Sequence, residues 1–174
     1  APILCHISNF RPVKRIDDVV KVFAKVRAER ECTLLMVGDG PERGNAEALS
    51  RELGVAEDVV FLGKVKNPIE PLLISDLLLL PSETESFGLV ALEAMAAGVP
   101  VVSSNVGGLP EVNAQGETGF LRPVSDVDGM AQDSLKVLDD TRLPAFRDQA
   151  KRRSELFHIE RILPRYLAVY GRAL

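Results

Sequence analysis

Short apolar runs alternate along the chain with longer stretches in which apolar residues recur at helical spacing. This alternation is typical of βα units built around a parallel sheet. The pattern predicts strands at residues 2–8, 33–37, 59–62, 77–80, 100–103 and 119–121, and helices at residues 15–29, 41–53, 69–75, 87–97, 127–139, 143–154 and 159–172. The strands are almost wholly apolar, as strands covered by helices on both faces should be. We therefore expect an α/β domain with a Rossmann-like, doubly wound parallel sheet flanked by helices.

Length and charge exclude several classes of function. The 174 residues are sufficient for one domain, and we treat residues 1–174 as a single unit. No apolar run approaches the ~20 residues of a membrane-spanning helix, so an integral membrane protein is not expected. A formal net charge of −4 argues against nucleic acid as a partner, because binders of polyanions need a clustered basic surface.

The two cysteines and the chain start bear on compartment and completeness. Cys5 and Cys32 lie in apolar strand-like runs, without a partner cysteine or histidine at metal-ligand spacing. Free thiols in a reducing cytoplasm are the expected state, and no metal site is expected. The chain opens directly on a strand, without a signal peptide, so we interpret it as one lobe of a longer protein. The apolar stripe of the helix predicted at 159–172 indicates a partner outside this lobe, and a homo-oligomer is left open.

A doubly wound sheet binds ligands beyond the carboxyl ends of its strands, so the loops leaving the strands are the candidate sites. The loop after the first strand carries three cations, Arg11, Lys14 and Arg15. Positive charge at a helix start opposes the helix macrodipole, and a bound phosphate would resolve that conflict. The alternative is that all three are solvated surface charges.

The loop at residues 38–44 resembles a dinucleotide-binding fingerprint but has the wrong glycine spacing. The acidic residue expected after the next strand is replaced by Gly63 and Lys64, so NAD binding is excluded. A tight turn is the favoured role of Gly38, with close approach of a ligand left open. The loop at Val65 is predicted to be a turn whose backbone could pair with the edge of a base.

Glu93 is the only charged residue between positions 87 and 102, in a predicted helix that is otherwise apolar. We expect this carboxylate to be buried, which requires a partner. An internal salt bridge, a side chain reaching out to solvent and a ligand contact are the alternatives. Glu85 is expected just outside the same helix, whose first N–H groups form an anion site. Two carboxylates beside an anion site would repel the anion, so they are better suited to accept hydrogen bonds from sugar hydroxyls.

Ordinary catalytic groups are scarce. His6 and His158 are isolated histidines in apolar surroundings, a setting more typical of structural histidines. No Ser/His/Asp or Cys/His arrangement is suggested. The glycines at 107 and 108 suit either a turn or the approach of a phosphate. The lobe is therefore expected to bind a substrate rather than to complete the chemistry alone.

Several motifs together resemble a known family. They are Glu85 and Glu93 in an E-x7-E element, residues 37–41, residues 60–63, the glycines at 107 and 108 with Glu111, and residues 119–121. This set resembles the C-terminal, donor-binding lobe of the retaining GT-B glycosyltransferases of family four, over nearly the whole chain. The resemblance implies that the lobe binds a nucleoside diphosphate sugar and that the N-terminal acceptor domain is absent from this chain.

The same resemblance implies the site. It identifies Glu85 and Lys14 as catalytic, with Glu85 on the transferred sugar and Lys14 on the diphosphate. The remaining contacts that it implies are Glu93 to the ribose, the amides of Phe87, Gly88 and Leu89 to sugar and phosphates, and Val65 to the base. The family arginine five residues before the lysine is replaced by Asn9, so Arg11 is expected to supply that charge. No cofactor or metal is implied, because the nucleotide sugar is a substrate.

Within the family, residues 7–15 and 83–88 are similar to those of a branch that transfers N-acetylglucosamine from its UDP donor to L-malate, the first step of bacillithiol biosynthesis. Other open alternatives are a GT-B transferase with another nucleotide sugar or acceptor, such as a cell-envelope glycan or lipid, a UDP-sugar 2-epimerase, and a non-catalytic nucleotide-binding module. The scarcity of catalytic histidines and carboxylates counts against the epimerase.

Overall fold

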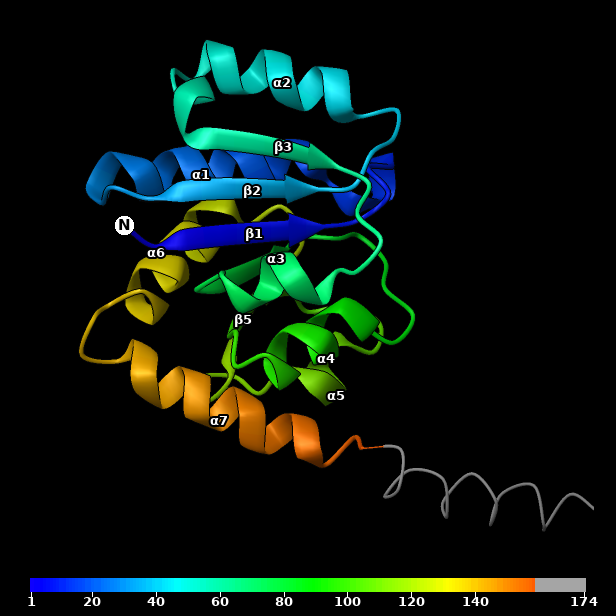
Figure 1. Ribbon diagram of the computed structural model, residues 1–174, viewed down its shortest axis with the longest axis vertical. Coiled ribbons are helices and arrows are strands. Elements are labelled where there is room, and N and C mark those ends of the chain that lie inside the picture. Colours follow the sequence, from blue (N-terminus) through cyan, green and yellow to red (C-terminus); the bar gives the residue numbers. More distant parts are fainter. Residues whose placement is uncertain (159–174) are drawn as a thin grey trace, which may run out of the picture.

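The computed structural model describes residues 1–158, which form one parallel sheet with helices on both faces (Figure 1). The strands are β1 (Ile3–Ile7), β2 (Thr33–Val37), β3 (Val59–Gly63), β4 (Leu77–Leu80), β5 (Val101–Ser104) and β6 (Gly119–Arg122). Their order across the sheet is β3-β2-β1-β4-β5-β6. The doubly wound sheet predicted from the sequence is confirmed. The strand order reverses between β1 and β4, which is where such a sheet opens a crevice for a ligand.

The helices follow the predicted alternation, with one addition. They are α1 (Ile16–Glu29), α2 (Arg43–Glu52), α3 (Ile69–Leu73), α4 (Leu89–Ala96), α5 (Leu109–Val112), α6 (Val127–Val137) and α7 (Leu143–Glu155), with short 3₁₀ turns η1 (Pro12–Lys14) and η2 (Ala56–Asp58). Helix α5 was not predicted, because two glycines and a proline at its start are typical of a turn. The helix predicted at 159–172 lies outside the described residues.

Two helix starts differ from the prediction for a local backbone reason. Arg15 has φ 51° and ψ 54°, and Gly88 has φ 78° and ψ 45°. Both are in the left-handed region, so α1 begins at Ile16 and α4 begins at Leu89 rather than at residue 87. At Gly88 the missing Cβ also makes room, because a Cβ there would lie 2.8 Å from Leu109 Cδ2. The glycine lets the chain turn sharply into α4 while staying packed on α5.

Alternating strand residues build two hydrophobic cores, one on each face of the sheet. Leu34 and Met36 of β2 join the core covered by α1 and α6, whereas Leu35 and Val37 join the core covered by α3, α4 and α5. Helix α7 packs against α4 on this second face (Figure 1). The central strands are therefore buried from both sides, whereas the edge strand β3 exposes Val60 and Leu62. A ligand is expected at the loops that leave the carboxyl ends of the strands.

Candidate functional site

An ion pair joins two of the loops at the carboxyl edge of the sheet. Lys14, at the end of η1, donates from Nζ to both carboxylate oxygens of Glu85, at 2.9 and 3.2 Å. The two residues are 71 positions apart in sequence and meet because β1 and β4 are neighbouring strands. Only 21% of the Lys14 side chain and 12% of the Glu85 side chain are exposed. The structure thus brings the two residues predicted to be catalytic into direct contact.

A second set of contacts fixes the register of the same two loops. The Glu83 backbone N–H donates to the Val13 carbonyl at 2.8 Å. Arg15 donates from Nη1 to Glu83 Oε1 at 2.7 Å and from Nε to Asp18 Oδ2 at 2.6 Å. These bonds to Asp18 and Glu83 raise the pKa of Arg15 above its ordinary value. The Arg15 guanidinium is therefore paired with two carboxylates of the protein itself.

Arg11 and Asn9 differ from Arg15. Both are exposed, and within residues 1–158 Arg11 has no ion-pair partner. Asn9 lines a hollow beside the Lys14–Glu85 pair. The three cations predicted at this helix start therefore have three different environments: Arg15 is structural, Lys14 is paired with Glu85, and Arg11 faces solvent.

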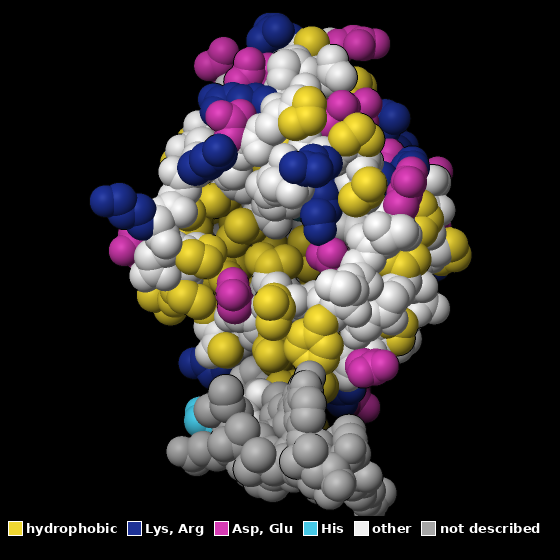
Figure 2. Space-filling view, turned by 90° about the vertical axis from the view of Figure 1, so that its right-hand side faces the viewer, with side chains coloured by type: hydrophobic (Ala, Val, Ile, Leu, Met, Phe, Trp, Pro, Cys, Tyr) yellow, Lys and Arg dark blue, Asp and Glu magenta, His cyan; other side chains and the backbone are white. Residues whose placement is uncertain are grey.

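Two adjacent hollows meet at the ion pair, on the face seen in Figure 2. One has a volume of about 370 Å³ and is lined by Ile7, Ser8, Asn9, Lys14, Glu85, Ser86, Gly88, Leu89 and Val90. The other has a volume of about 520 Å³ and is lined by Val13, Lys14, Glu83, Thr84, Glu85, Ser86, Val106 and Gly107. Volumes of this order suit a small-molecule ligand. Figure 2 shows hydrophobic side chains in the depression and charged side chains beside them.

The start of α4 borders the first hollow. The first turn of a helix leaves backbone N–H groups without intrahelical partners, and their partial positive charge attracts anions. Gly88 and Leu89 both line this hollow, and Leu89 is 64% exposed. Phe87 is partly buried and packs edge-on against Phe157, with ring centroids 6.3 Å apart. The predicted anion site at this helix start is thus adjacent to Lys14.

The prediction that Glu93 is buried is wrong, because its side chain is only partly covered. Apart from Glu93, helix α4 is apolar on all sides, so its sequence does not reveal which side faces the crevice. Glu93 follows Leu89 by four residues and Val90 by three, so it shares their side of the helix. Within residues 1–158 Glu93 has no ion pair or side-chain hydrogen bond, so the salt-bridge alternative finds no partner there.

Glycines pack the loop after β2 closely against the loop after β1. A Cβ on Gly38 would lie 1.8 Å from the Ser8 carbonyl oxygen, and one on Gly40 would lie 2.1 Å from that of Asn9. Close packing against the Ser8 and Asn9 backbone therefore accounts for Gly38, in line with the favoured turn interpretation. Gly38 also donates its N–H to the Gly63 carbonyl at 2.8 Å. Beyond Gly63 the loop with Val65 is exposed, and Val65 does not line either hollow.

The buried His6 links the loop after β1 to strand β4. From the sequence, this histidine was expected only to be structural. Its Nδ1 is 2.8 Å from the Leu79 carbonyl and its Nε2 is 2.8 Å from Ser8 Oγ. Ser8 Oγ also accepts from the Phe10 N–H at 3.3 Å. Burial lowers the pKa of His6 to about 4, against the opposing effect of the Leu79 hydrogen bond and with help from the Lys14 charge. The neutral imidazole thus anchors a residue that lines the hollow.

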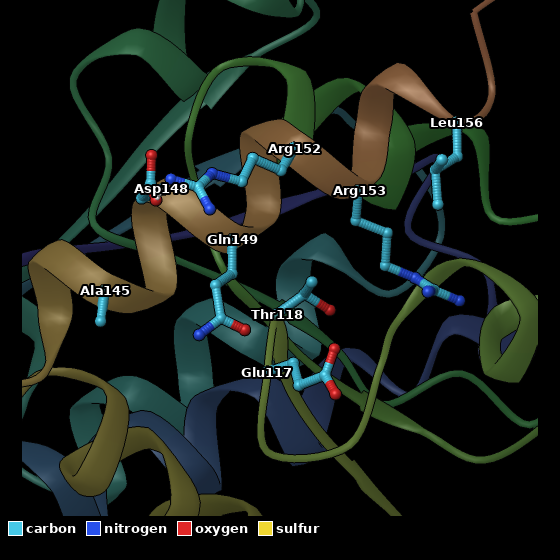
Figure 3. Close-up of a pocket in the computed structure, with 8 residues that line it drawn as sticks. All are labelled: Glu117, Thr118, Ala145, Asp148, Gln149, Arg152, Arg153 and Leu156. Atoms are coloured by element: carbon cyan, nitrogen blue, oxygen red, sulfur yellow. Dashed lines mark ion pairs between the residues drawn. The ribbon is translucent and has the colours of Figure 1, made fainter.

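A separate hollow of about 490 Å³ lies between α7 and the loop before β6 (Figure 3). Glu117 and Thr118 border it from the amino end of β6, the edge opposite to the Lys14–Glu85 pair. Three of its charged side chains have partners within the fold, since Arg152 pairs with Asp148 at 2.9 Å and Arg153 donates to the Val112 carbonyl at 2.6 Å. The candidate site is therefore the crevice at the carboxyl edge.

No helix in residues 1–158 is long and apolar enough to cross a membrane. The same residues contain no group of three or more His, Cys, Asp or Glu side chains arranged to hold a metal ion.

Known proteins match nearly the whole length of this chain. The sequence model of the family described as "Glycosyl transferases group 1" matches residues 1–155. N-acetyl-alpha-D-glucosaminyl L-malate synthase of Bacillus anthracis is 48% identical over 170 residues, which cover 97% of this chain and 45% of that protein. The chain thus spans about half the length of this curated relative.

Solved structures agree with the sequence comparison. Sucrose-phosphate synthase from Thermosynechococcus elongatus superposes with a TM-score of 0.86 at 30% identity, covering 99% of this chain and 45% of that one. The structure of TarM superposes with a TM-score of 0.89 at 25% identity, covering 97% of this chain and 34% of that one. In both proteins, as in the bacterial relative, a further region lies beyond the part that this chain matches.

Proposed function

Since the chain belongs to the group 1 glycosyl transferases, we propose that it is the donor-binding lobe of a retaining GT-B glycosyltransferase. The proposed donor is UDP-N-acetylglucosamine and the proposed acceptor is L-malate, as the name of the relative with 48% identity suggests. An N-terminal lobe of the same enzyme would hold the acceptor. The observation that carries the proposal is the contact between Lys14 and Glu85 beside the start of α4.

The proposed chemistry is departure of UDP from the sugar. Negative charge grows on the diphosphate as the glycosidic bond breaks, and groups that meet that charge in the transition state lower the barrier. Lys14 and the amides at Gly88 and Leu89 supply positive charge at one edge of the crevice. Arg11, exposed in the same loop as Lys14, adds to this charge in the proposal. This scheme needs no divalent metal.

The two carboxylates take the hydroxyl groups of the donor in this proposal. Glu85 lies in contact with Lys14 and accepts hydrogen bonds from the transferred sugar, while Glu93, on the Leu89 side of α4, accepts them from the ribose. The backbone at Val65 pairs with the base. Asn9, at the edge of the smaller hollow, lies beside the diphosphate.

The test is a calorimetric titration of the 174-residue chain with UDP, ADP and GDP. UDP should bind, and ADP and GDP should bind more weakly. Equal affinity for all three would contradict a base-selective donor site, and tighter binding of ADP or GDP would point to a different donor. In the enzyme with both lobes, L-malate should accept the sugar; transfer only to another acceptor would reject the malate assignment alone.

A further inference from the structure

The groups proposed to hold the diphosphate and the transferred sugar of the donor form an ion pair with each other in the structure. Lys14 Nζ lies 2.9 Å from one oxygen of Glu85 and 3.2 Å from the other, so this carboxylate has a strong cationic partner. Both side chains line both hollows. The ion pair therefore stands at the point where a diphosphate in one hollow and a sugar in the other would meet. This inference rests on the proposed function.

We propose that the Lys14–Glu85 pair makes the site discriminate between an intact nucleotide sugar and the free nucleoside diphosphate. A diphosphate that draws Lys14 away leaves the Glu85 carboxylate, only 12% exposed, without its partner and close to a second negative group. An unsatisfied, poorly solvated charge is unfavourable. An intact donor brings sugar hydroxyls that donate to Glu85, whereas the free diphosphate brings none.

The pair also gives the site a way to release its product. Once the sugar has moved to the acceptor, Glu85 loses its hydroxyl partners and regains Lys14, which weakens the hold on the diphosphate. Release of product limits turnover in many enzymes, so a group that competes for Lys14 only after transfer favours turnover.

The backbone around the pair does not depend on it. The Glu83 N–H donates to the Val13 carbonyl at 2.8 Å, a backbone bond between the same two loops that uses neither the Glu85 nor the Glu83 side chain. Neutralising Glu85 should therefore leave the loops in place. Glu83 is also a matched control, because it lies two residues away and borders the larger hollow, but it pairs with Arg15 and is 50% exposed.

The experiment measures the affinity of the unmodified chain, Glu85→Gln and Glu83→Gln for UDP and for UDP-N-acetylglucosamine by calorimetry. We expect Glu85→Gln to bind UDP about tenfold more tightly while gaining nothing for the nucleotide sugar. Glu83→Gln should change both affinities by less than about threefold, as expected for an exposed pair. The preference for intact donor over UDP then shrinks in Glu85→Gln alone.

Some of the other outcomes contradict only the discrimination between donor and free diphosphate, and one also contradicts the donor-binding function. Unchanged UDP affinity in Glu85→Gln, or an equal gain in Glu83→Gln, overturns the discrimination proposal and leaves the donor-binding function standing. An equal gain of Glu85→Gln for UDP and for the nucleotide sugar also overturns it, because the sugar then does not use Glu85. Absence of binding of either ligand to all three proteins overturns the proposed function and this inference together.

Discussion

Gly107 lies so close to Glu85 that a Cβ on this glycine would stand 1.6 Å from the Glu85 carbonyl oxygen. The next residue, Gly108, donates its N–H to the same carbonyl at 3.3 Å. The loop after β5 therefore supports the backbone of the loop that presents Glu85. The close approach explains the two glycines without any contact to a phosphate, which the sequence had left as an alternative to a turn.

Gly107→Ala should displace the Glu85 loop. Gly107 has φ 52°, where a side chain costs about 1–2 kcal/mol, and the collision with backbone adds about 1–3 kcal/mol. Gly116→Ala is the matched control, since Gly116 has φ 75° and open space around its Cβ position. Denaturant unfolding and UDP titration of both variants check this. Gly107→Ala should lose more stability than Gly116→Ala, and only Gly107→Ala should bind UDP more weakly. Equal losses of stability in the two variants would contradict the importance of the close contact between Gly107 and Glu85.

The fold was predictable from sequence because it depends on local patterns. Most strands are short apolar runs, and their alternation with longer amphipathic stretches indicates βα units around a parallel sheet. Helix α5 was missed because its signal, Gly-Gly-Leu-Pro, is equally typical of a turn. A segment whose conformation depends on contacts with residues distant in sequence cannot be assigned from such local patterns.

The site was predictable in position but not in contacts. The Lys14–Glu85 pair joins residues 71 positions apart, and its formation depends on the adjacency of β1 and β4, which a pattern along the chain does not specify. Glu93 was expected to be buried because every other residue near it is apolar. The structure leaves one side of α4 uncovered at the crevice, so Leu89 is 64% exposed and Glu93 is only partly covered.

His6 should make folding stability depend on pH. Its pKa is about 4 in the folded chain, against an ordinary value of 6.5. Between these values the unfolded chain binds a proton that the folded chain does not. The contribution of neutral His6 to the free energy of unfolding is therefore fully present above pH 6.5 and is lost as the pH drops toward 4. The loss amounts to about 3 kcal/mol. Denaturant unfolding at pH 7.5 and pH 4.5 measures it.

Variants separate His6 from other groups that titrate in this range. His6→Gln should lower stability at pH 7.5 but reduce the difference between the two pH values. His158→Gln changes the other histidine of the chain, which is exposed, and should leave the difference as it is. If His6→Gln shows the full pH dependence, carboxylates rather than His6 are responsible for it.

Lys14→Ala should impair sugar transfer far more than folding. Loss of one group that meets charge in the transition state typically costs about 10²–10³ in turnover. The stability loss should be about 1–2 kcal/mol, because the Glu85 side chain, only 12% exposed, loses its cationic partner. Initial rates in the enzyme with both lobes and unfolding of the chain measure the two effects. Lys25→Ala, which breaks an exposed pair with Asp128 on the surface, should affect neither; turnover near normal in Lys14→Ala would reject the catalytic assignment.

Glu93→Gln should weaken UDP binding without affecting folding. Within residues 1–158 this carboxylate has no partner to lose, so the free energy of unfolding should change by less than about 0.5 kcal/mol. A neutral amide accepts hydrogen bonds from ribose hydroxyls less strongly than a carboxylate does, and affinity for UDP should fall about tenfold.

The ribose contact has a direct control in the ligand. The 2′,3′-dideoxy analogue of UDP lacks both hydroxyls, so the unmodified chain and Glu93→Gln should bind it with the same affinity. Glu70→Gln, an exposed carboxylate on α3, should not alter the affinity for either ligand. An equal loss for UDP and its dideoxy analogue in Glu93→Gln would place the carboxylate near another part of the donor. The hydroxyl-dependent loss is expected because Glu93 lies on the side of α4 that borders the crevice.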